Sequence, residues 1–240
     1  MSTRGPSAAT AGRPGPFLDE PRRALRWAGV LLGLAVALCL LMWSTTCRDA
    51  IQQVDDAVFH AAENTEWGPA VGFAKVLAFV GGTLVTWCIR VVVLVVLARR
   101  RHWLSAAAFA LAIVTSEMLI GGLKDAYQRP RPPNGLVTTS GWSFPSGHAI
   151  AAAVTALGLV IVLAPPGHAR WTWERRAALY ASLMAMSRVY LRAHWLSDVV
   201  GGALLGAGLA IGWPALLVVL RSRRSTTAAE VPPTREAGEG

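Results

Sequence analysis

Hydrophobic residues are concentrated in six long runs, which are separated by shorter polar or charged segments. Each run has close to the roughly 20 residues that an α-helix needs to cross the hydrocarbon core of a bilayer. The second run is longer than one span and contains Gly81-Gly82, so we expect a lead-in helix before the span itself. The pattern predicts an all-α fold, a polytopic bundle of six transmembrane helices, with spans at about residues 25–43, 69–97, 103–123, 146–164, 176–191 and 196–220.

The composition supports a membrane protein. The chain of 240 residues is 53% hydrophobic and 15% charged, with a mean hydropathy of +0.42. Residues 1–22 and 223–240 are rich in small and polar residues without periodicity, so we expect disordered tails around a membrane domain at 23–222. The first run is long enough to span and no small-residue cleavage site follows it, so we do not expect a cleaved signal peptide.

The distribution of charge predicts the orientation. The net charge is +9 and the pI is about 10.7, which in a soluble protein would suggest nucleic acid as a partner. Most of the positive charge is instead Arg beside the hydrophobic runs, and with six spans these clusters fall on one side, which the positive-inside rule makes cytoplasmic. We therefore expect a multi-pass plasma-membrane protein, surrounded by lipids and without a nucleic-acid partner, that has both termini in the cytoplasm. The clusters are Arg22, Arg23 and Arg26; Arg99 to Arg101; Arg170, Arg175 and Arg176; and Arg221, Arg223 and Arg224.

The opposite side receives an acidic loop at residues 49–66 and two shorter connections, at 124–145 and 192–197. The positive-inside rule predicts few basic residues in these two connections, yet both contain them, so these basic residues need an explanation other than topology. Those residues are Lys124, Arg129, Arg131 and Arg192.

The fourth run begins with Pro145-Ser146-Gly147-His148, which is typical of the first turn of a helix. The N–H groups of such a turn have no intrahelical partner, and the helix dipole adds partial positive charge, so the turn can bind an anion such as phosphate. His148 would stand beside that anion. Ser is also an ordinary helix cap, so the tetrapeptide alone does not indicate a site.

Two cationic side chains stand near the outer end of the third run. Lys124 closes the predicted helix, and Arg131 follows in a loop stiffened by Pro132. Arg offers a planar fork and Lys a compact charge, so the two can hold one anion from two directions. The alternative is that both reach to lipid headgroups at the interface.

The outer end of the fifth run carries Ser187-Arg188, and His194 and Asp198 follow. The spacing of four places His194 and Asp198 on one face of the opening turn of the sixth helix. A carboxylate there can fix the imidazole tautomer and stabilise its cation, which makes His an effective nucleophile or base. The spacing alone does not decide whether His194 or His148 attacks.

Together these three motifs resemble the signature of the type 2 phosphatidic acid phosphatases, in the acid phosphatase and vanadium haloperoxidase superfamily. The signature is Lys, six residues and Arg-Pro; then Pro-Ser-Gly-His; then Ser-Arg, five residues, His, three residues and Asp. The chain matches it without a departure. The matching segments are Lys124 to Pro132, Pro145 to His148, and Ser187 to Asp198.

The resemblance implies a role for each residue. His194 attacks phosphorus to give a phosphohistidine, Asp198 orients it, and His148 protonates the leaving oxygen. The phosphate oxygens are bound by Lys124, Arg131, Arg188 and the backbone N–H groups near Ser146 and Gly147.

A metal site is the competing hypothesis, because His148, His194 and Asp198 are also ligand types. We expect neither metal nor cofactor, because three cations converge there without a further carboxylate cluster. The three cysteines show no metal or disulfide pattern.

Two further residues are candidates for supporting roles. Glu117 lies seven residues before Lys124, about 10 Å deeper on nearly the same helix face. It either supports Lys124 or lines the lipid-headgroup cavity, or else it has a structural role in which it is protonated or locally paired. Arg90 in the second span could be its partner, but the expected depths place Arg90 nearer the cytoplasm. Tyr127 is expected at the mouth of the site, with Arg129 and Trp142.

The sequence therefore predicts a metal-independent lipid phosphatase with its active site on the non-cytoplasmic face. Polyprenyl diphosphate is the favoured substrate, and phosphatidate and phosphatidylglycerol phosphate also fit a headgroup-level phosphate on an apolar tail. One alternative is a phosphotransferase of the same superfamily. The other is an anion transporter, although transporters place their charges near the bilayer midplane rather than at helix ends.

Overall fold

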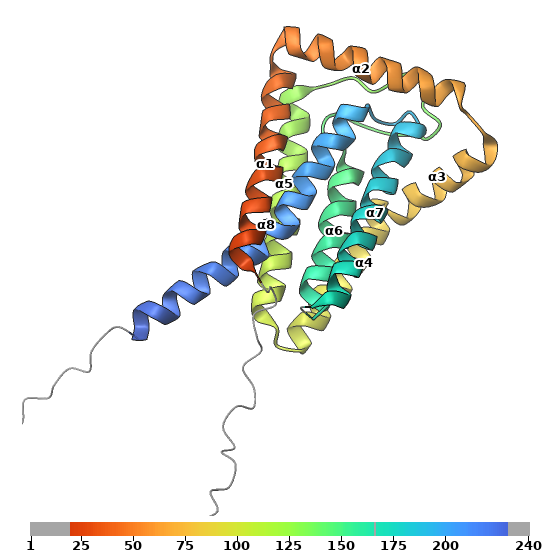
Figure 1. Ribbon diagram of the computed structural model, residues 1–240. Helices are drawn as coiled ribbons and strands as arrows, with labels where there is room; N and C mark the ends of the chain where they lie inside the picture. The colour runs from red at the N-terminus through yellow and green to blue at the C-terminus, as the bar shows by residue number, and fades with distance from the viewer. Residues whose placement is uncertain (1–19, 166, 230–240) are drawn as a thin grey trace, which may run out of the picture.

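The computed structural model describes residues 20–165 and 167–229, which form eight helices and no strand (Figure 1). Of the tails predicted at 1–22 and 223–240, residues 1–19 and 230–240 lie outside the described residues. The helices are α1 (Pro21–Trp43), α2 (Thr45–Asn64), α3 (Gly68–Val80), α4 (Thr83–Arg99), α5 (Trp103–Tyr127), α6 (Gly147–Leu163), α7 (His168–Tyr190) and α8 (Leu196–Ala229).

The prediction of an all-α membrane protein is confirmed, and the count of six spans is confirmed in part. By length and composition α1, α5 and the segment Leu196–Arg223 of α8 can each cross a bilayer. The pair α3 and α4, bent by 42°, can provide a fourth span. Helix α6 is apolar but has 17 residues, and α7 begins with a polar first half, so neither meets the same criterion. Figure 1 shows both running beside α8 in the bundle.

The predicted lead-in helix is present. Helix α3 ends at Val80, Gly81-Gly82 form the break, and α4 starts at Thr83. At Gly82 an added Cβ would lie 2.9 Å from the carbonyl oxygen of Phe79, so the turn leaves no room for a side chain. The close turn explains why the second run is divided here.

The acidic loop predicted at residues 49–66 is wrong, because most of it is helix α2, which lies across one end of the bundle (Figure 1). Its inner face repeats at helical spacing through Ile51, Asp55, Val58 and Phe59, all of them buried or half-buried. The acidic residues between these positions concealed the pattern.

Two predicted domain boundaries also shift. Helix α1 begins at Pro21, because proline is well tolerated in the first turn of a helix. Helix α8 continues to Ala229, so residues 223–229 are helical rather than disordered. The apolar run stops at Leu220, but neither Gly nor Pro follows it before Ala229, so the helix has no reason to end there.

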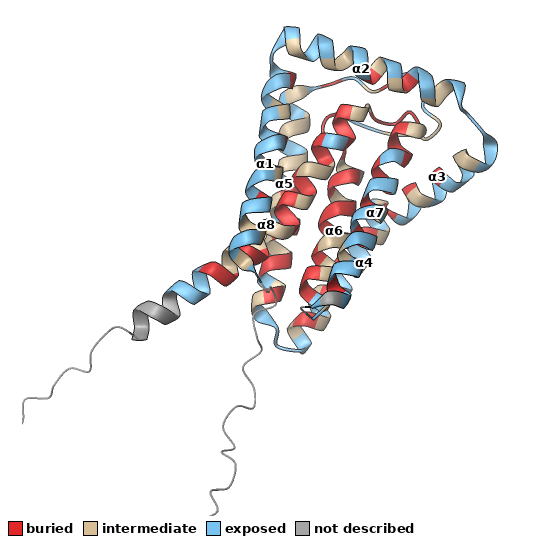
Figure 2. Cartoon of the chain, in the orientation of Figure 1, coloured by how far each residue is buried: buried red, intermediate tan, exposed pale blue. Residues whose placement is uncertain are grey.

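Close packing of α6 against α8 brings two of the predicted motifs together. A Cβ added at Gly202 would lie 2.7 Å from the Ser146 carbonyl oxygen, and one at Gly206 would lie 2.6 Å from that of Ile150. The backbone N–H of Ser146 donates to the carbonyl of Asp198 at 3.0 Å. Figure 2 shows buried positions concentrated along α6 and α8, whereas large apolar side chains are exposed on α1, α3 and α4, as expected for surfaces that face lipid.

Candidate active site

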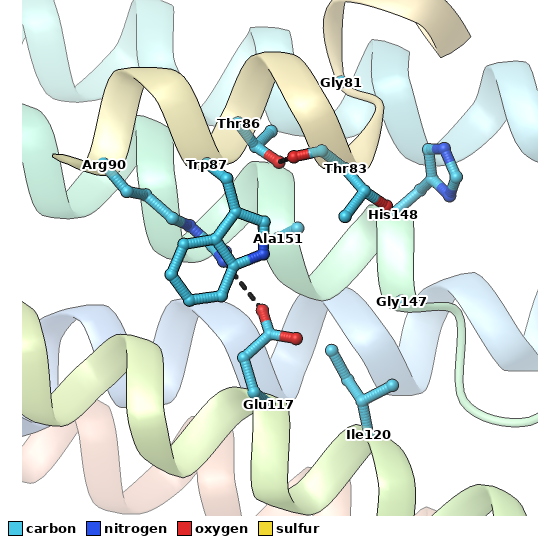
Figure 3. Close-up of a pocket in the computed structure, with 10 residues that line it drawn as sticks. All are labelled: Gly81, Thr83, Thr86, Trp87, Arg90, Glu117, Ile120, Gly147, His148 and Ala151. Atoms are coloured by element: carbon cyan, nitrogen blue, oxygen red, sulfur yellow. Dashed lines mark hydrogen bonds and ion pairs between the residues drawn. The ribbon is translucent and has the colours of Figure 1, made fainter. Parts of the chain in front are cut away.

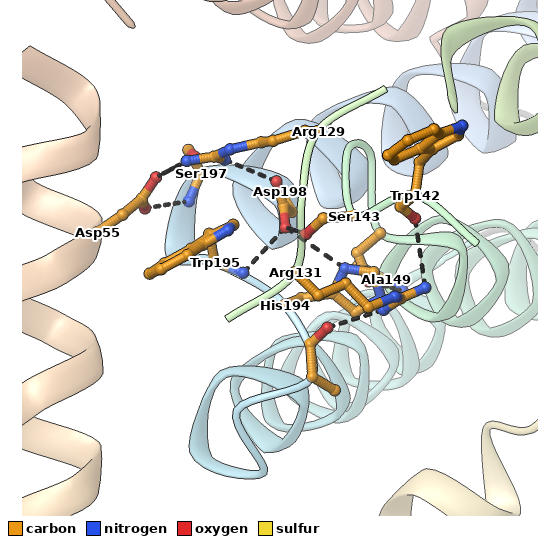
Figure 4. Close-up of polar contacts among 12 residues, drawn as sticks. Asp55, Arg129, Arg131, Trp142, Ser143, Ala149, His194, Trp195, Ser197 and Asp198 are labelled. Carbon is orange, nitrogen blue, oxygen red and sulfur yellow. Dashed lines mark hydrogen bonds and ion pairs between the residues drawn. The ribbon is translucent and has the colours of Figure 1, made fainter. Parts of the chain in front are cut away.

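The predicted motifs meet below α2, where the end of α5, the start of α6, the turn after α7 and the start of α8 come together (Figure 4). Ser146 caps α6, and its Oγ accepts from the N–H of Ala149 at 3.4 Å. Gly147 and His148 are the first two residues of the helix, so their N–H groups lack an intrahelical acceptor. The predicted anion-binding turn is therefore formed.

His194 lies between a cation and a carboxylate. Its Nε2 is 3.2 Å from Nη1 of Arg131, and its Nδ1 is 3.4 Å from Oδ2 of Asp198. Because a guanidinium can only donate, Nε2 must accept, and in a neutral ring the proton is then on Nδ1, toward Asp198. The Nδ1 contact is too long for a strong hydrogen bond, but it favours this tautomer. The Nε2 lone pair is thus directed toward the cations.

Burial keeps His194 uncharged. The side chain is 3% exposed, and burial lowers its pKa to about 4. The nearby charge and hydrogen bonding of Asp198 raise the pKa, whereas Arg131 and Arg188 lower it. At pH 7 the imidazole is therefore neutral, which is the form that can attack phosphorus.

Backbone carbonyls fix the guanidinium of Arg131 beside His194. Its Nη2 and the Lys124 ammonium both donate to the carbonyl of Trp142, so the two predicted phosphate ligands are neighbours. The other carbonyl acceptors, at 2.8–2.9 Å, belong to Ser140, Gly141 and Ala193.

Arg188 supplies a third cation. Its side chain is buried, and its Nε has no hydrogen-bond partner among the described residues. Its carbonyl accepts from the N–H groups of Ala193 and His194 at 3.0 and 3.3 Å, which links the end of α7 to the turn that carries His194. A buried cationic donor without a partner is costly unless an anion approaches it.

Asp198 is fully buried and held by several donors. Its Oδ1 accepts from Arg129 Nη1 at 2.7 Å, and its Oδ2 accepts from the Trp195 N–H at 2.9 Å and from the Ser143 hydroxyl. Ser143 in turn donates its N–H to the Arg129 carbonyl at 2.8 Å. These bonds fix the carboxylate in the orientation that faces Nδ1 of His194.

Arg129 is the main residue whose role the sequence did not predict. It lies inside the site rather than at its mouth, and it joins Asp198 to α2 through Asp55 at 2.6 Å and Gln52 at 2.6 Å. Asp55 also accepts from the Ser197 N–H and hydroxyl at 2.8 and 2.6 Å. Only the basic charge of Arg129 on the side predicted to be non-cytoplasmic indicated a special role, and nothing in the sequence pattern paired it with Asp55.

The four basic residues that break the charge rule are now explained. Lys124 and Arg131 point into the candidate site. Arg129 and Arg192 hold α2, the latter through Glu63 at 3.3 Å and Glu66 at 2.7 Å.

Comparison with known proteins agrees with this geometry. Residues 105–222 match the family model of the PAP2 superfamily. The chain belongs to the PAP2 superfamily. The match begins in α5 and ends within α8, so it includes every residue of the predicted signature. The resemblance inferred from the three motifs is thereby confirmed.

Relatives of this PAP2 superfamily chain act on lipid phosphates. Decaprenylphosphoryl-5-phosphoribose phosphatase of Mycobacterium tuberculosis is 37% identical over 122 residues, which cover 45% of this chain and 58% of the relative. Phosphatidylglycerophosphatase B of Bacillus subtilis is 33% identical over 114 residues, 45% of this chain and 55% of the relative. The matches thus span little more than half of the length of each relative.

The structural similarity covers more of the chain than the sequence matches do. The crystal structure of a transmembrane PAP2-type phosphatidylglycerolphosphate phosphatase from Bacillus subtilis has a TM-score of 0.69 and 26% identity. The alignment covers 82% of the PAP2 chain described here and 96% of the other chain.

The structure gives different contacts to Tyr127 and Glu117, the two residues predicted to support the site. Tyr127 donates its hydroxyl to the Cys39 carbonyl at 2.6 Å and packs edge-on against Trp43 and Phe144, so it joins α5 to α1. Glu117 pairs with Arg90 at 2.7 Å rather than with Lys124. The depth argument, which placed Arg90 nearer the cytoplasm than Glu117, is wrong, because α4 starts at Thr83 and Arg90 lies only two turns into that helix.

The donor set of this PAP2 site consists of cations and histidines. Among the described residues, no group of three or more His, Cys, Asp or Glu side chains is arranged to hold a metal ion. The charge that could neutralise a phosphate comes from Lys124, Arg131 and Arg188.

Proposed function

We propose that this chain is an integral-membrane lipid phosphatase that works through a phosphohistidine on His194, with its site on the non-cytoplasmic face. The observation that carries the proposal is the placement of His194 Nε2 against Arg131, with Nδ1 toward Asp198. The negative oxygens of a phosphate ester shield its phosphorus from a nucleophile. Cations beside the lone pair of His194 neutralise those oxygens, so the arrangement suits attack on a phosphate ester.

The first step forms an N–P bond and breaks the ester P–O bond. Nε2 of His194 attacks phosphorus in line with the leaving oxygen, and the charge of the resulting imidazolium is stabilised by Asp198. The equatorial oxygens bind the cations and the first N–H groups of α6. Burial and the neighbouring cations lower the pKa of His148, and the negative charge of the bound phosphate offsets the cations. His148 can then take up a proton and give it to the leaving oxygen as general acid.

The second step reverses these roles. Water enters in place of the leaving group, and the deprotonated His148 takes its proton as the oxygen attacks phosphorus. The N–P bond breaks, inorganic phosphate leaves, and His194 returns to its neutral form.

Phosphate release tests the proposal. Purified protein in lipid micelles is assayed against polyprenyl diphosphate, phosphatidate and phosphatidylglycerol phosphate, with His194→Gln as the control. We expect release from at least one of them, and none from the variant. Transfer to an added alcohol with little free phosphate would indicate the phosphotransferase, and phosphate flux across vesicles without hydrolysis would indicate the transporter.

Sidedness can be measured with introduced cysteines. In a background with Cys39, Cys47 and Cys88 replaced by Ser, Asn134→Cys and Asn64→Cys should react with an impermeant thiol reagent added to intact cells, whereas Arg100→Cys should not. All three positions are exposed in the structure, so accessibility does not bias the comparison. Labelling of Arg100→Cys alone would reverse the proposed topology.

Chelation tests the role of the cations. Because Lys124, Arg131 and Arg188 supply the positive charge, activity should survive excess EDTA, and vanadate should inhibit by forming a five-coordinate adduct that resembles the transferring phosphoryl group. Activity lost on chelation and restored by a divalent ion would contradict the metal-free mechanism.

A further inference from the structure

An apolar groove between α1, α5 and α8 lies apart from the candidate site. A cavity of about 130 Å³ adjoins that site between α4, α5 and α6, with Gly147 and His148 in its lining (Figure 3). The groove is on the opposite side of α5, where Figure 1 shows α1, α5 and α8 side by side, and its volume is about 610 Å³. The mechanism proposed above uses no residue of this groove, which we call the α1–α5 groove.

Small residues open the α1–α5 groove. Helices α1 and α5 both pack against α8, which forms the floor. A Cβ added at Gly29 of α1 would meet nothing within 4 Å, so the space beside this wall is empty. At Gly208 of α8 an added Cβ would lie 2.7 Å from the Leu32 side chain, so α1 approaches the floor closely. Met118 of α5 belongs to the other wall and is 71% exposed.

The lining of the groove favours a hydrocarbon ligand. Thr115 and Trp213 are its two polar side chains, and both are satisfied: the indole N–H donates to the Thr115 hydroxyl at 3.0 Å, and the hydroxyl donates to the Leu111 carbonyl at 2.6 Å. The other lining residues are Gly, Ala, Leu and Met. A ligand here gains free energy by burying apolar surface, whereas a polar headgroup would lose its hydrogen bonds with water.

The groove is closed at the end nearer the candidate site. Tyr127 of α5 donates its hydroxyl to the Cys39 carbonyl of α1 at 2.6 Å, and its ring packs edge-on against Trp43. Cys39 lies seven residues beyond Leu32, which is about 10 Å along the helix. A chain anchored at headgroup level therefore enters from the other end, in the leaflet away from the candidate site.

The length of the groove suits a chain in that leaflet. Its lining extends from Leu25 to Leu32 on α1 and from Gly208 to Leu216 on α8. At about 1.5 Å per residue these segments are roughly 10 and 12 Å long. Each leaflet contributes roughly 15 Å of hydrocarbon, half of the core of a bilayer. The groove thus covers most of the depth of one leaflet.

Arginine side chains surround the open end of the groove. Arg22, Arg26 and Gly29 follow one another at spacings of four and three, so they share one face of α1. Arg22 and Arg26 are exposed, and neither has an ion-pair partner among the described residues, whereas Arg23 pairs with Glu20 at 3.3 Å. Basic residues between transmembrane helices at a bilayer surface attract anionic headgroups.

We propose that the α1–α5 groove binds one acyl chain of an anionic phospholipid, whose phosphate lies between Arg22 and Arg26. This lipid is not the substrate, because Leu216 is 18 residues, or about 27 Å, along α8 from Asp198. The site is therefore a structural lipid site in the leaflet opposite the reaction, and it does not depend on the proposed phosphatase function.

Lipid retention in native mass spectrometry tests the role of the charges. The protein in detergent is titrated with dioleoyl phosphatidylglycerol or with dioleoyl phosphatidylcholine, which have the same chains and differ in net charge. We expect tighter binding of phosphatidylglycerol. Arg22→Gln/Arg26→Gln should weaken it roughly 30-fold, the effect of two arginines at an anionic lipid surface. Arg23→Gln is the control and should leave the affinity unchanged, because the charge of Arg23 is already paired.

A matched pair of glycine substitutions tests the groove. Gly29→Leu places a side chain in the groove, whereas Gly33→Leu makes the same change one turn later, at a position outside the lining. An added Cβ meets nothing within 4 Å at either glycine, so both variants should fold, which their thermal midpoints check. We expect Gly29→Leu to lose the bound lipid and Gly33→Leu to keep it, with phosphate release unchanged in both.

Four results would overturn the proposal. Equal affinity of the wild type for the two lipids would show that the headgroup is not recognised. Equal lipid binding by Gly29→Leu and Gly33→Leu would show that the lipid lies elsewhere. A wild-type dimer that Gly29→Leu dissociates, without bound lipid, would assign the groove to a second copy of the chain. A raised KM in Gly29→Leu with unchanged lipid binding would assign it to the tail of the substrate.

Discussion

Replacing His194 with Gln should abolish turnover on every substrate, with a loss on the order of 10⁶-fold, the scale seen when a covalent nucleophile is removed. The reason is positional: Nε2 of His194 is held beside Arg131, with its lone pair toward the cations. An amide in its place cannot form the N–P bond. Phosphate release under saturating substrate measures the loss.

Replacing His148 with Gln should have a smaller effect that depends on the leaving group. Removing a general acid costs typically ~10²–10⁴-fold when the leaving oxygen needs a proton. An alkoxide from a lipid monophosphate needs one, whereas p-nitrophenolate does not. His148→Gln should therefore lose far more activity on phosphatidylglycerol phosphate than on p-nitrophenyl phosphate. Equal losses of activity on the two substrates would contradict the assignment of His148 as the general acid.

Replacing Arg129 with Gln should lower both stability and turnover strongly. Arg129 is the shared partner of Asp55 and Asp198, which are 2% and 0% exposed, so its loss leaves two carboxylates buried without their cation. Breaking a buried ion pair from one side typically costs about 3–5 kcal/mol. We expect a large drop in the thermal midpoint, measured by tryptophan fluorescence in detergent. We also expect a fall in kcat, because Asp198 loses a bond that orients it.

Arg192→Gln is the matched control for this prediction. Arg192 also ties the turn between α7 and α8 to α2, but its partners Glu63 and Glu66 are 36% and 44% exposed, so water can replace the lost bonds. We expect a small change in stability and an unchanged kcat. If Arg129→Gln changed stability and kcat as little as Arg192→Gln, the link from α2 to the candidate site would not contribute to function.

The sequence predicted the all-helical membrane domain and the three motifs that meet at the candidate site, because both depend on local pattern. Helices in a bilayer need long apolar runs, and the signature places Lys124, Ser146 and Asp198 at helix ends, where spacing along the chain determines position. The structure brings these ends together through the close contact of Gly202 with the Ser146 carbonyl. No pattern in the sequence predicts that contact, although small residues on α8 are compatible with it.

What the sequence could not predict are pairings between distant elements. Asp55 was assigned to a surface loop because its neighbours are acidic, whereas it is the buried end of the link through Arg129. Arg90 was set aside because its expected depth was nearer the cytoplasm than that of Glu117, whereas it lies only two turns into α4. In both cases one charged residue is recognisable in the sequence, but its partner is chosen by the packing of helices.

The location of the phosphoryl group in the covalent intermediate tests the central claim most directly. Wild-type protein is mixed with p-nitrophenyl phosphate, quenched in alkali within the first turnover, digested, and mapped by mass spectrometry. The mechanism predicts an acid-labile, base-stable phosphoryl group on His194, present also in His148→Gln and absent from His194→Gln. A phosphoryl group on His148 instead, retained when His194 is replaced, would show that the two histidines have the opposite roles.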